Sequence, residues 1–134
     1  MGGRGSAFNH SATARKREGY IKAMQPLQKK SVSRYVGSDK HITIKFNKRG
    51  IEHIADDILN KRIGIAKREI SKLDDFLKDA KYVKSSGLYK ERKDDITRFY
   101  YFHDKTKNLR YNVAEEEYKG HYRRYLYSIA KKKK

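Results

Sequence analysis

The hydrophobic and polar residues of this chain follow two different periods. Residues 41–46 alternate and are rich in β-branched and aromatic side chains, which predicts a β-strand. Asn47 follows as the N-cap of a helix predicted over about 48–60. The apolar residues of that helix recur at helical spacing, and they are Ile51, Ile54, Ile58 and Leu59.

A second helix is predicted over about 66–80, after Gly64 interrupts the pattern. Its apolar stripe consists of Ile70, Leu73, Phe76, Leu77 and Ala80. The alternating period then returns and predicts strands over 81–84, 96–103, 109–114 and 121–130. The connections expected between them are a loop over 85–95, a hairpin turn over 104–108 and a turn at Glu115–Glu117. Helices grouped before an antiparallel sheet indicate an α+β fold: an N-terminal strand and two helices, followed by a roughly four-stranded antiparallel meander.

The N-terminal quarter shows no such pattern. Residues 1–18 have no periodicity, and we expect them to be disordered. In residues 19–38 a few apolar side chains could form one or two helical turns, which Pro26 limits. We therefore expect order to begin near His41. The predicted organisation is a basic flexible arm or linker over 1–38, a single domain over 39–130 and a basic tail over 131–134.

The charge of the chain favours a polyanionic partner. It has 34 Lys and Arg against 16 Asp and Glu, for a formal net charge of +18. Residues 1–38 contain one acidic residue, Glu18, and the last four residues are all lysine. Because each phosphate neutralised by Lys or Arg releases condensed counterions, nucleic acid is the expected partner. An anionic membrane surface and an acidic protein are the alternatives.

Several classes of chemistry find no support in the sequence. The chain has no cysteine, which excludes disulfides, thiolate zinc sites and cysteine nucleophiles. No apolar run approaches the roughly 20 residues that span a bilayer, so we expect no membrane partner. Phosphate-loop and dinucleotide motifs are absent, and no His and carboxylate spacing indicates a metal. We therefore expect neither a metal nor a cofactor.

Tyrosine is frequent, with eleven residues, most of them in the predicted strands near the C-terminus. In a regular strand Arg98 and Tyr100 share one face, and Arg123 and Tyr125 share one face of the last strand. Such a face suits RNA, because aromatic rings stack on bases and arginine holds phosphate. The alternative is that tyrosines are good strand formers whose hydroxyls face water.

RNA can be cleaved without a metal if a side chain transfers protons and cations stabilise the phosphorane. His53 lies at the edge of the apolar stripe of the first helix and is the first candidate for proton transfer. The alternative for His53 is a surface histidine paired with Asp57 one turn on. Arg98 lies in the middle of a strand and is the candidate cation, unless it is an ordinary exposed strand residue.

Other candidates lie at the chain end and in the loops. Ser128 could hold a phosphate oxygen, but it lies on the opposite face from Tyr125 unless a bulge intervenes. Lys84, Lys90 and Lys93 are cations that could reach phosphate, although a solvated charged run is the default for each.

Six segments of the chain resemble a known family. They are I-x-H-I around His53, D-A-K-Y-V-K-S-S at 79–86, R-K-D-D-I at 92–96, F-Y-Y-F at 99–102, L-R-Y-N-V at 109–113 and Y-R-R-Y-L-Y-S-I at 122–129. In this order they resemble the phage-associated branch of the barnase–EndoU–colicin–RelE-like ribonucleases, which are toxin-type domains. The resemblance covers roughly residues 40–130 and implies helices followed by a four-stranded antiparallel sheet.

The resemblance also implies roles for single residues. His53 would act as base or acid, and Ser128 would orient the phosphate. Arg98 with Lys84 or Lys93 would supply the positive charge. We add Tyr100, Tyr125, Arg123 and Lys90 as the residues expected to contact the substrate.

The sequence thus predicts a metal-independent endoribonuclease of toxin type, which cleaves RNA by attack of the 2′-hydroxyl. RNA is the expected partner, and an acidic immunity or antitoxin protein is a second one. The cytoplasm is the expected site of action, to which the chain would be delivered as part of a phage or toxin protein. The first rival is a non-catalytic RNA- or DNA-binding module. The second rival is an accessory protein that binds an acidic partner.

Overall fold

The computed structural model describes the backbone of residues 2–61, 63–89 and 95–131. In chain order the elements are α1 (Gly2–Met24), the 3-10 helix η1 (Gln25–Lys29), β1 (Ser31–Tyr35), β2 (His41–Lys45), α2 (Lys48–Lys61), the 3-10 helix η2 (Ile70–Lys72), α3 (Leu73–Asp79), β3 (Lys81–Ser85), β4 (Ile96–Asp104), β5 (Leu109–Tyr118) and β6 (His121–Lys131). This is an α+β fold, as the sequence predicts. No helix among the described residues has the length and apolar character needed to cross a membrane.

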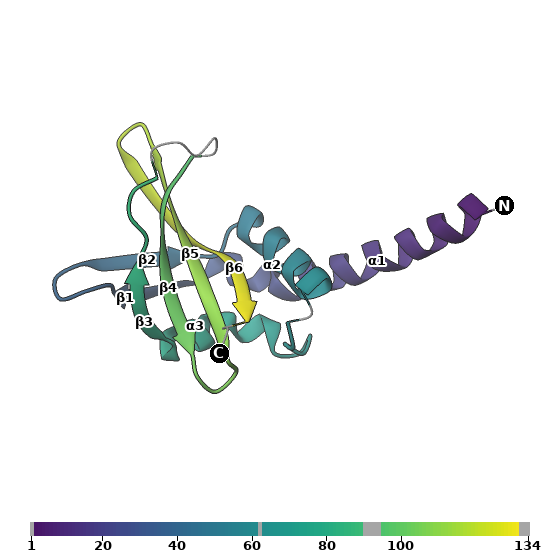
Figure 1. Ribbon diagram of the computed structural model, residues 1–134, viewed down its shortest axis with the longest axis horizontal. Coiled ribbons are helices and arrows are strands. Elements are labelled where there is room, and N and C mark those ends of the chain that lie inside the picture. The colour runs from purple at the N-terminus through teal and green to yellow at the C-terminus, as the bar shows by residue number, and fades with distance from the viewer. Residues whose placement is uncertain (1, 62, 90–94, 132–134) are drawn as a thin grey trace.

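The strands form one mixed, curled sheet in the order β1-β2-β6-β5-β4-β3 (Figure 1). β2 and β6 pair in parallel at a single position, and the other neighbouring strands are antiparallel. The curl brings the first strand back toward the other end of the sheet. Arg34 of β1 donates to the carbonyl of Leu77 in α3, and its guanidinium carbon lies 4.9 Å from the ring centre of Phe102 in β4. The inner face of the sheet therefore encloses the main core.

Helix α2 packs where β2 and β6 diverge. Its predicted N-cap is confirmed, because Asn47 Oδ1 accepts from the amide of Gly50 at 2.9 Å. Ile51, Ile54 and Ile58 of its apolar stripe belong to the main core, with Ile54 0% exposed, whereas Leu59 at the edge of the stripe is only half-buried. On the same helix Asp57 accepts from the amide of Ile129 at 3.1 Å, which satisfies a β6 donor that β2 does not reach. Helix α2 is thereby fixed against β6.

The expectation that order begins near His41 is wrong. Residues 2–24 form α1, which extends away from the body of the protein (Figure 1). Met24 and Leu27 are 0% exposed and Val32 of β1 is 1% exposed, so residues 24–36 contribute to the same core as the later elements. The physical reason is that these apolar side chains complete the inner face, a contribution that their irregular spacing in sequence does not reveal.

Two further boundaries differ from the predictions. The segment predicted as a helix over 66–80 is helical only in η2 and α3. The turn predicted at Glu115–Glu117 does not exist, because β5 continues to Tyr118 and the chain reverses at Lys119 and Gly120, both with positive φ. The sheet has six strands rather than the five expected.

Buried ionic contacts explain why β5 continues through two glutamates. Glu115 is 2% exposed, and its carboxylate accepts from the Tyr100 hydroxyl and from Arg124 Nε, each at 2.8 Å. Arg98 Nε lies 3.3 Å away and Lys40 Nζ 3.9 Å away. We call these five residues the Glu115 cluster. A buried carboxylate held in this way is stable in a strand, whereas without these partners its burial would be costly.

The neighbouring Glu116 is satisfied in the same way. It accepts from Arg49 of α2 and from the Tyr125 hydroxyl, each at 2.6 Å. Because Glu115 and Glu116 point to opposite faces of β5, the strand carries one buried, ion-paired carboxylate on each side.

The Glu115 cluster predicts a pH dependence of stability. Burial raises the pKa of Glu115, but the hydrogen bonds from Tyr100 and Arg124 and the charges of Arg124 and Lys40 outweigh burial, so its pKa lies below the usual value. As the pH falls, Glu115 takes up a proton in the unfolded chain before it does so in the folded protein. Its ionised carboxylate therefore stabilises the fold above the unfolded pKa of about 4.3, and this contribution is lost as the pH falls further. We expect Glu115→Gln to flatten the decline of unfolding free energy between about pH 5 and pH 3. Urea denaturation across this range measures it. The exposed Glu117→Gln is the control, and equal slopes for both variants would contradict the prediction.

Candidate functional site

The outer face of the sheet, which points away from the main core, has a small apolar cluster of its own. Its buried members are Ile96, Phe99, Ala114 and Tyr125. Tyr101 and Tyr127 pack against them. Aromatic side chains therefore form the floor of this face.

A β-bulge in β6 decides which side chains join the outer face. Asn112 of β5 pairs with Ser128, whereas the next residue, Val113, pairs with Leu126, so Tyr127 is the extra residue. Beyond the bulge the alternation shifts by one position. Ser128 consequently lies on the face of Tyr125, as the sequence analysis required for both to meet one ligand.

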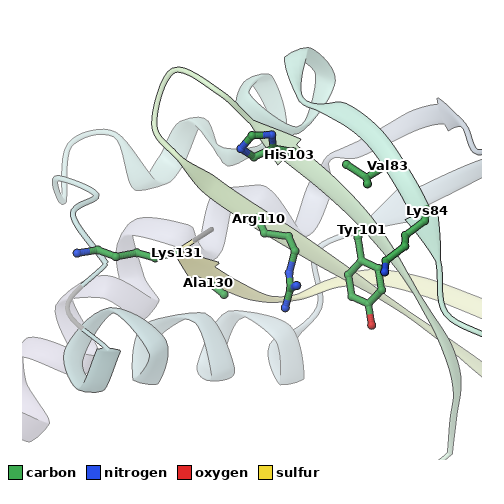
Figure 2. Close-up of a pocket in the computed structure, with 7 residues that line it drawn as sticks. All are labelled: Val83, Lys84, Tyr101, His103, Arg110, Ala130 and Lys131. Atoms are coloured by element: carbon green, nitrogen blue, oxygen red, sulfur yellow. The ribbon is translucent and has the colours of Figure 1, made fainter. Parts of the chain in front are cut away.

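The outer face holds a pocket of about 500 Å³, shown in Figure 2. It is lined by Val83, Lys84, Tyr101, His103, Arg110, Ala130 and Lys131. In Figure 2 Lys84, Tyr101 and Arg110 extend from three neighbouring strands toward the same opening, whereas Lys131 points to the other side. The guanidinium carbon of Arg110 lies 5.0 Å from the ring centre of Tyr101. The lining is thus cationic and aromatic and contains no carboxylate.

A second pocket of about 200 Å³ adjoins the first and shares Tyr101 and Arg110 with it. Its other lining residues are Tyr89, Phe99, Asn112 and Ser128. A chain of hydrogen bonds crosses its floor: Arg110 Nε donates to Asn112 Oδ1 at 3.0 Å, and Asn112 Nδ2 donates to Ser128 Oγ at 2.8 Å. Ser128 therefore accepts from the protein and keeps its own hydroxyl proton to donate to a ligand.

His53 lies at the β6 edge of this face. Its ring centre is 4.2 Å from that of Tyr127, and the Tyr127 ring is in turn 5.5 Å from Phe99 in the second pocket. His53 Nδ1 lies 3.3 Å from Oδ2 of Asp57, which is 3% exposed. Because a carboxylate only accepts, this contact favours the tautomer with the proton on Nδ1 and leaves Nε2 able to take a proton. The pairing that the sequence analysis gave as the structural alternative is therefore present, and it also suits a general base.

Strand spacing separates the lysine candidate from the histidine. Three strand spacings of about 4.8 Å lie between β3, which carries Lys84, and β6, beside which His53 lies. The backbones of β3 and β6 are thus on the order of 14 Å apart. At this separation Lys84 and His53 suit different phosphates of one strand better than a single phosphate.

Comparisons with protein-family models, curated proteins and solved structures gave no match.

The structure divides the predicted site residues between these faces. His53, Ser128 and Lys84 lie on or beside the outer face. Arg98 and Tyr100 belong to the Glu115 cluster on the inner face. A single catalytic group made of His53, Arg98 and Ser128 is therefore not assembled.

Among the predicted substrate contacts, the two tyrosines are inaccessible. Tyr100 and Tyr125 are each 1% exposed and donate to buried carboxylates, so neither ring can stack on a base. Burial raises the pKa of Tyr125, and its hydrogen bond to Glu116 raises it further, so its phenol stays protonated. Arg123 is exposed on β6, whereas Lys90 and Lys93 lie outside the described residues.

The central residues of the outer face, Tyr101, Arg110 and Asn112, are not among the site residues that the sequence predicts. One signal for them was available, because the alternation in 96–103 already put Phe99, Tyr101 and His103 on one face. Arg110 and Asn112 carried no such signal, since their importance comes from pairing with β4 and β6. Among the described residues, no three His, Asp or Glu lie close enough together to hold a metal ion.

Proposed function

We propose that the outer face binds single-stranded RNA and that His53 promotes its cleavage by the 2′-hydroxyl, without a metal in the step. The observation that carries the proposal is that Asp57 holds His53 at the edge of the same face on which Arg110, Asn112 and Ser128 form one hydrogen-bonded chain. On this proposal the protein is an endoribonuclease, which is the activity that the resemblance to toxin-type ribonucleases implies.

Binding is supported by the composition of the two pockets. Lys84 and Arg110 provide positive charge, and Tyr101 and Tyr89 provide ring surfaces beside it. Proteins that bind single strands combine these two elements, because cations follow the phosphates while rings stack on bases of any sequence. Neither pocket is lined by a carboxylate, so no lining side chain repels the negatively charged phosphates of RNA.

The cleavage step needs little beyond these residues. His53 Nε2 takes the proton of the 2′-hydroxyl, the O2′–P bond forms, and the P–O5′ bond breaks as the 5′-oxygen takes a proton from water. Arg110 and the Ser128 hydroxyl stabilise the added charge on the phosphorane oxygens. The products are a 2′,3′-cyclic phosphate and a 5′-hydroxyl.

The test is incubation of the purified protein with a labelled RNA oligonucleotide in excess chelator, followed by analysis of the product ends. We expect fragments that end in a 2′,3′-cyclic phosphate. An oligonucleotide of the same sequence with 2′-deoxyribose throughout is the control and should stay intact. RNA that remains uncleaved, or DNA that is cut equally, would rule out the proposed chemistry.

The charge of the outer face predicts how binding depends on salt. Replacing Arg110 with Met removes a phosphate contact and keeps most of the apolar stem. The logarithm of the association constant decreases linearly with the logarithm of the salt concentration. We expect this decrease to be less steep by about 0.7 in the variant, the value for one phosphate contact on a single strand. Fluorescence anisotropy with a 2′-O-methyl oligonucleotide, which this step cannot cleave, measures the slope. Lys105→Met, in the exposed β4–β5 turn, is the control and should leave the slope unchanged.

A further inference from the structure

The Glu115 cluster holds more positive charge than is needed to neutralise its buried carboxylate. Three cations, Lys40, Arg98 and Arg124, surround the single carboxylate of Glu115. One cation would neutralise a buried carboxylate, and the Tyr100 hydroxyl already donates to it as well. The cluster therefore keeps a surplus of positive charge at this end of the inner face.

That surplus is accessible to solvent. The side chains of Lys40, Arg98 and Arg124 are 44%, 25% and 21% exposed, whereas that of Glu115 is 3% exposed. The carboxylate lies beneath the cations, and both arginines contact it through Nε. Among the described residues nothing accepts from their terminal nitrogens, and the guanidinium fork suits the oxygens of phosphate.

An aromatic ring lies beside these cations. Tyr122 is 54% exposed, and the guanidinium carbon of Arg124 lies 5.4 Å from its ring centre. Both belong to the β5–β6 hairpin, which projects from the body of the protein (Figure 1). Glu117 pairs with Tyr122 across the hairpin, but it is exposed, so solvent screens its charge.

From this geometry we infer a second nucleotide-binding site on the inner face, in which Lys40, Arg98 and Arg124 hold a phosphate and Tyr122 stacks on the base. Glu115 is a positioning residue that fixes the two guanidinium groups. The choice of a nucleotide as ligand rests on the proposed function, because an RNA strand bound on the outer face can continue around the hairpin. The anion site itself depends only on the contacts of the cluster.

Adenosine 5′-monophosphate is a suitable probe, because it has no internucleotide bond and its binding is independent of cleavage. We expect shifts of the Arg98 and Arg124 Nε–H and Tyr122 ring signals in NMR titrations. Lys40→Ala removes a charged hydrogen-bond donor and should weaken binding roughly tenfold. Tyr122→Ala should weaken it by a similar factor, since stacking on one ring is worth about 1–3 kcal/mol.

Two control variants show whether the weakening is specific to the proposed site. Lys72→Ala removes an equal charge from η2, and Tyr118→Ala removes an equally exposed ring from the same hairpin. Both should bind the nucleotide like the parent. Absence of shifts in the cluster, or weakening by the control variants equal to that of Lys40→Ala and Tyr122→Ala, would overturn the second site. Neither result depends on whether the protein cleaves RNA, so the two proposals fail separately.

Discussion

Replacing His53 with alanine is expected to lower the rate of RNA cleavage by about 10²–10⁴-fold, the usual contribution of one general acid or base. In the proposed mechanism the imidazole takes the 2′-hydroxyl proton, and alanine offers no group that could replace it. Binding should change little, because Lys84 and Arg110 are untouched. Single-turnover cleavage and anisotropy on the same oligonucleotide separate the two effects.

The matched control is His121→Ala, which removes an exposed histidine from the start of β6 and should cleave like the parent. A second variant, Asp57→Asn, tests the tautomer argument, because an amide can donate to Nδ1 and so favour the unproductive form. Its rate should fall even though His53 remains. If His53→Ala and His121→Ala cleaved at the same rate, His53 would have no part in the chemistry.

The largest effect on stability is expected from Gly50→Ala. A Cβ at this position in α2 would lie 2.0 Å from the carbonyl oxygen of Leu126 in β6. The obstacle is backbone, so either the helix or the strand must move. The better helix propensity of alanine, about 1 kcal/mol, cannot offset an overpacked interface, which costs about 3 kcal/mol or more. Thermal unfolding should show a midpoint lower by about 10 °C.

Gly64→Ala is the control for this prediction, because nothing lies within 4 Å of a Cβ built there. We expect it to be neutral or to stabilise by about 0.5 kcal/mol through the unfolded chain. Gly50→Ala should also slow RNA cleavage, since a shift of α2 moves His53 away from Tyr127. A Gly50→Ala protein as stable as Gly64→Ala would contradict the close approach of α2 and β6.

Where a segment is strongly periodic, the sequence predicted the fold well. The strand over 41–45 and the helix over 48–61 both agree with the predictions within one or two residues. Each has a complete apolar stripe and, for the helix, a capping residue at its start. The class α+β followed from the order of these elements.

Prediction failed where a distant contact outweighs local preference. Glutamate is depleted in strands, yet arginine and tyrosine partners from other elements keep Glu115 and Glu116 in β5. The strand over 31–35 has too few apolar residues to be recognised, yet the inner face buries Val32. In both cases the deciding partner is remote in sequence.

The sequence by itself determined the excess of positive charge, the α+β class and the position of His53 at the edge of an apolar helix stripe, because charge and periodicity are local properties. The tertiary structure alone decided which candidates meet. The bulge at Tyr127 moves Ser128 to the outer face, and strand pairing places Arg110 and Asn112 beside it. Arg98 and Tyr100 went to the inner face because Glu115 is buried there and requires their hydrogen bonds and charge. A side chain's face depends on register and on buried partners, and these form only when the chain has folded.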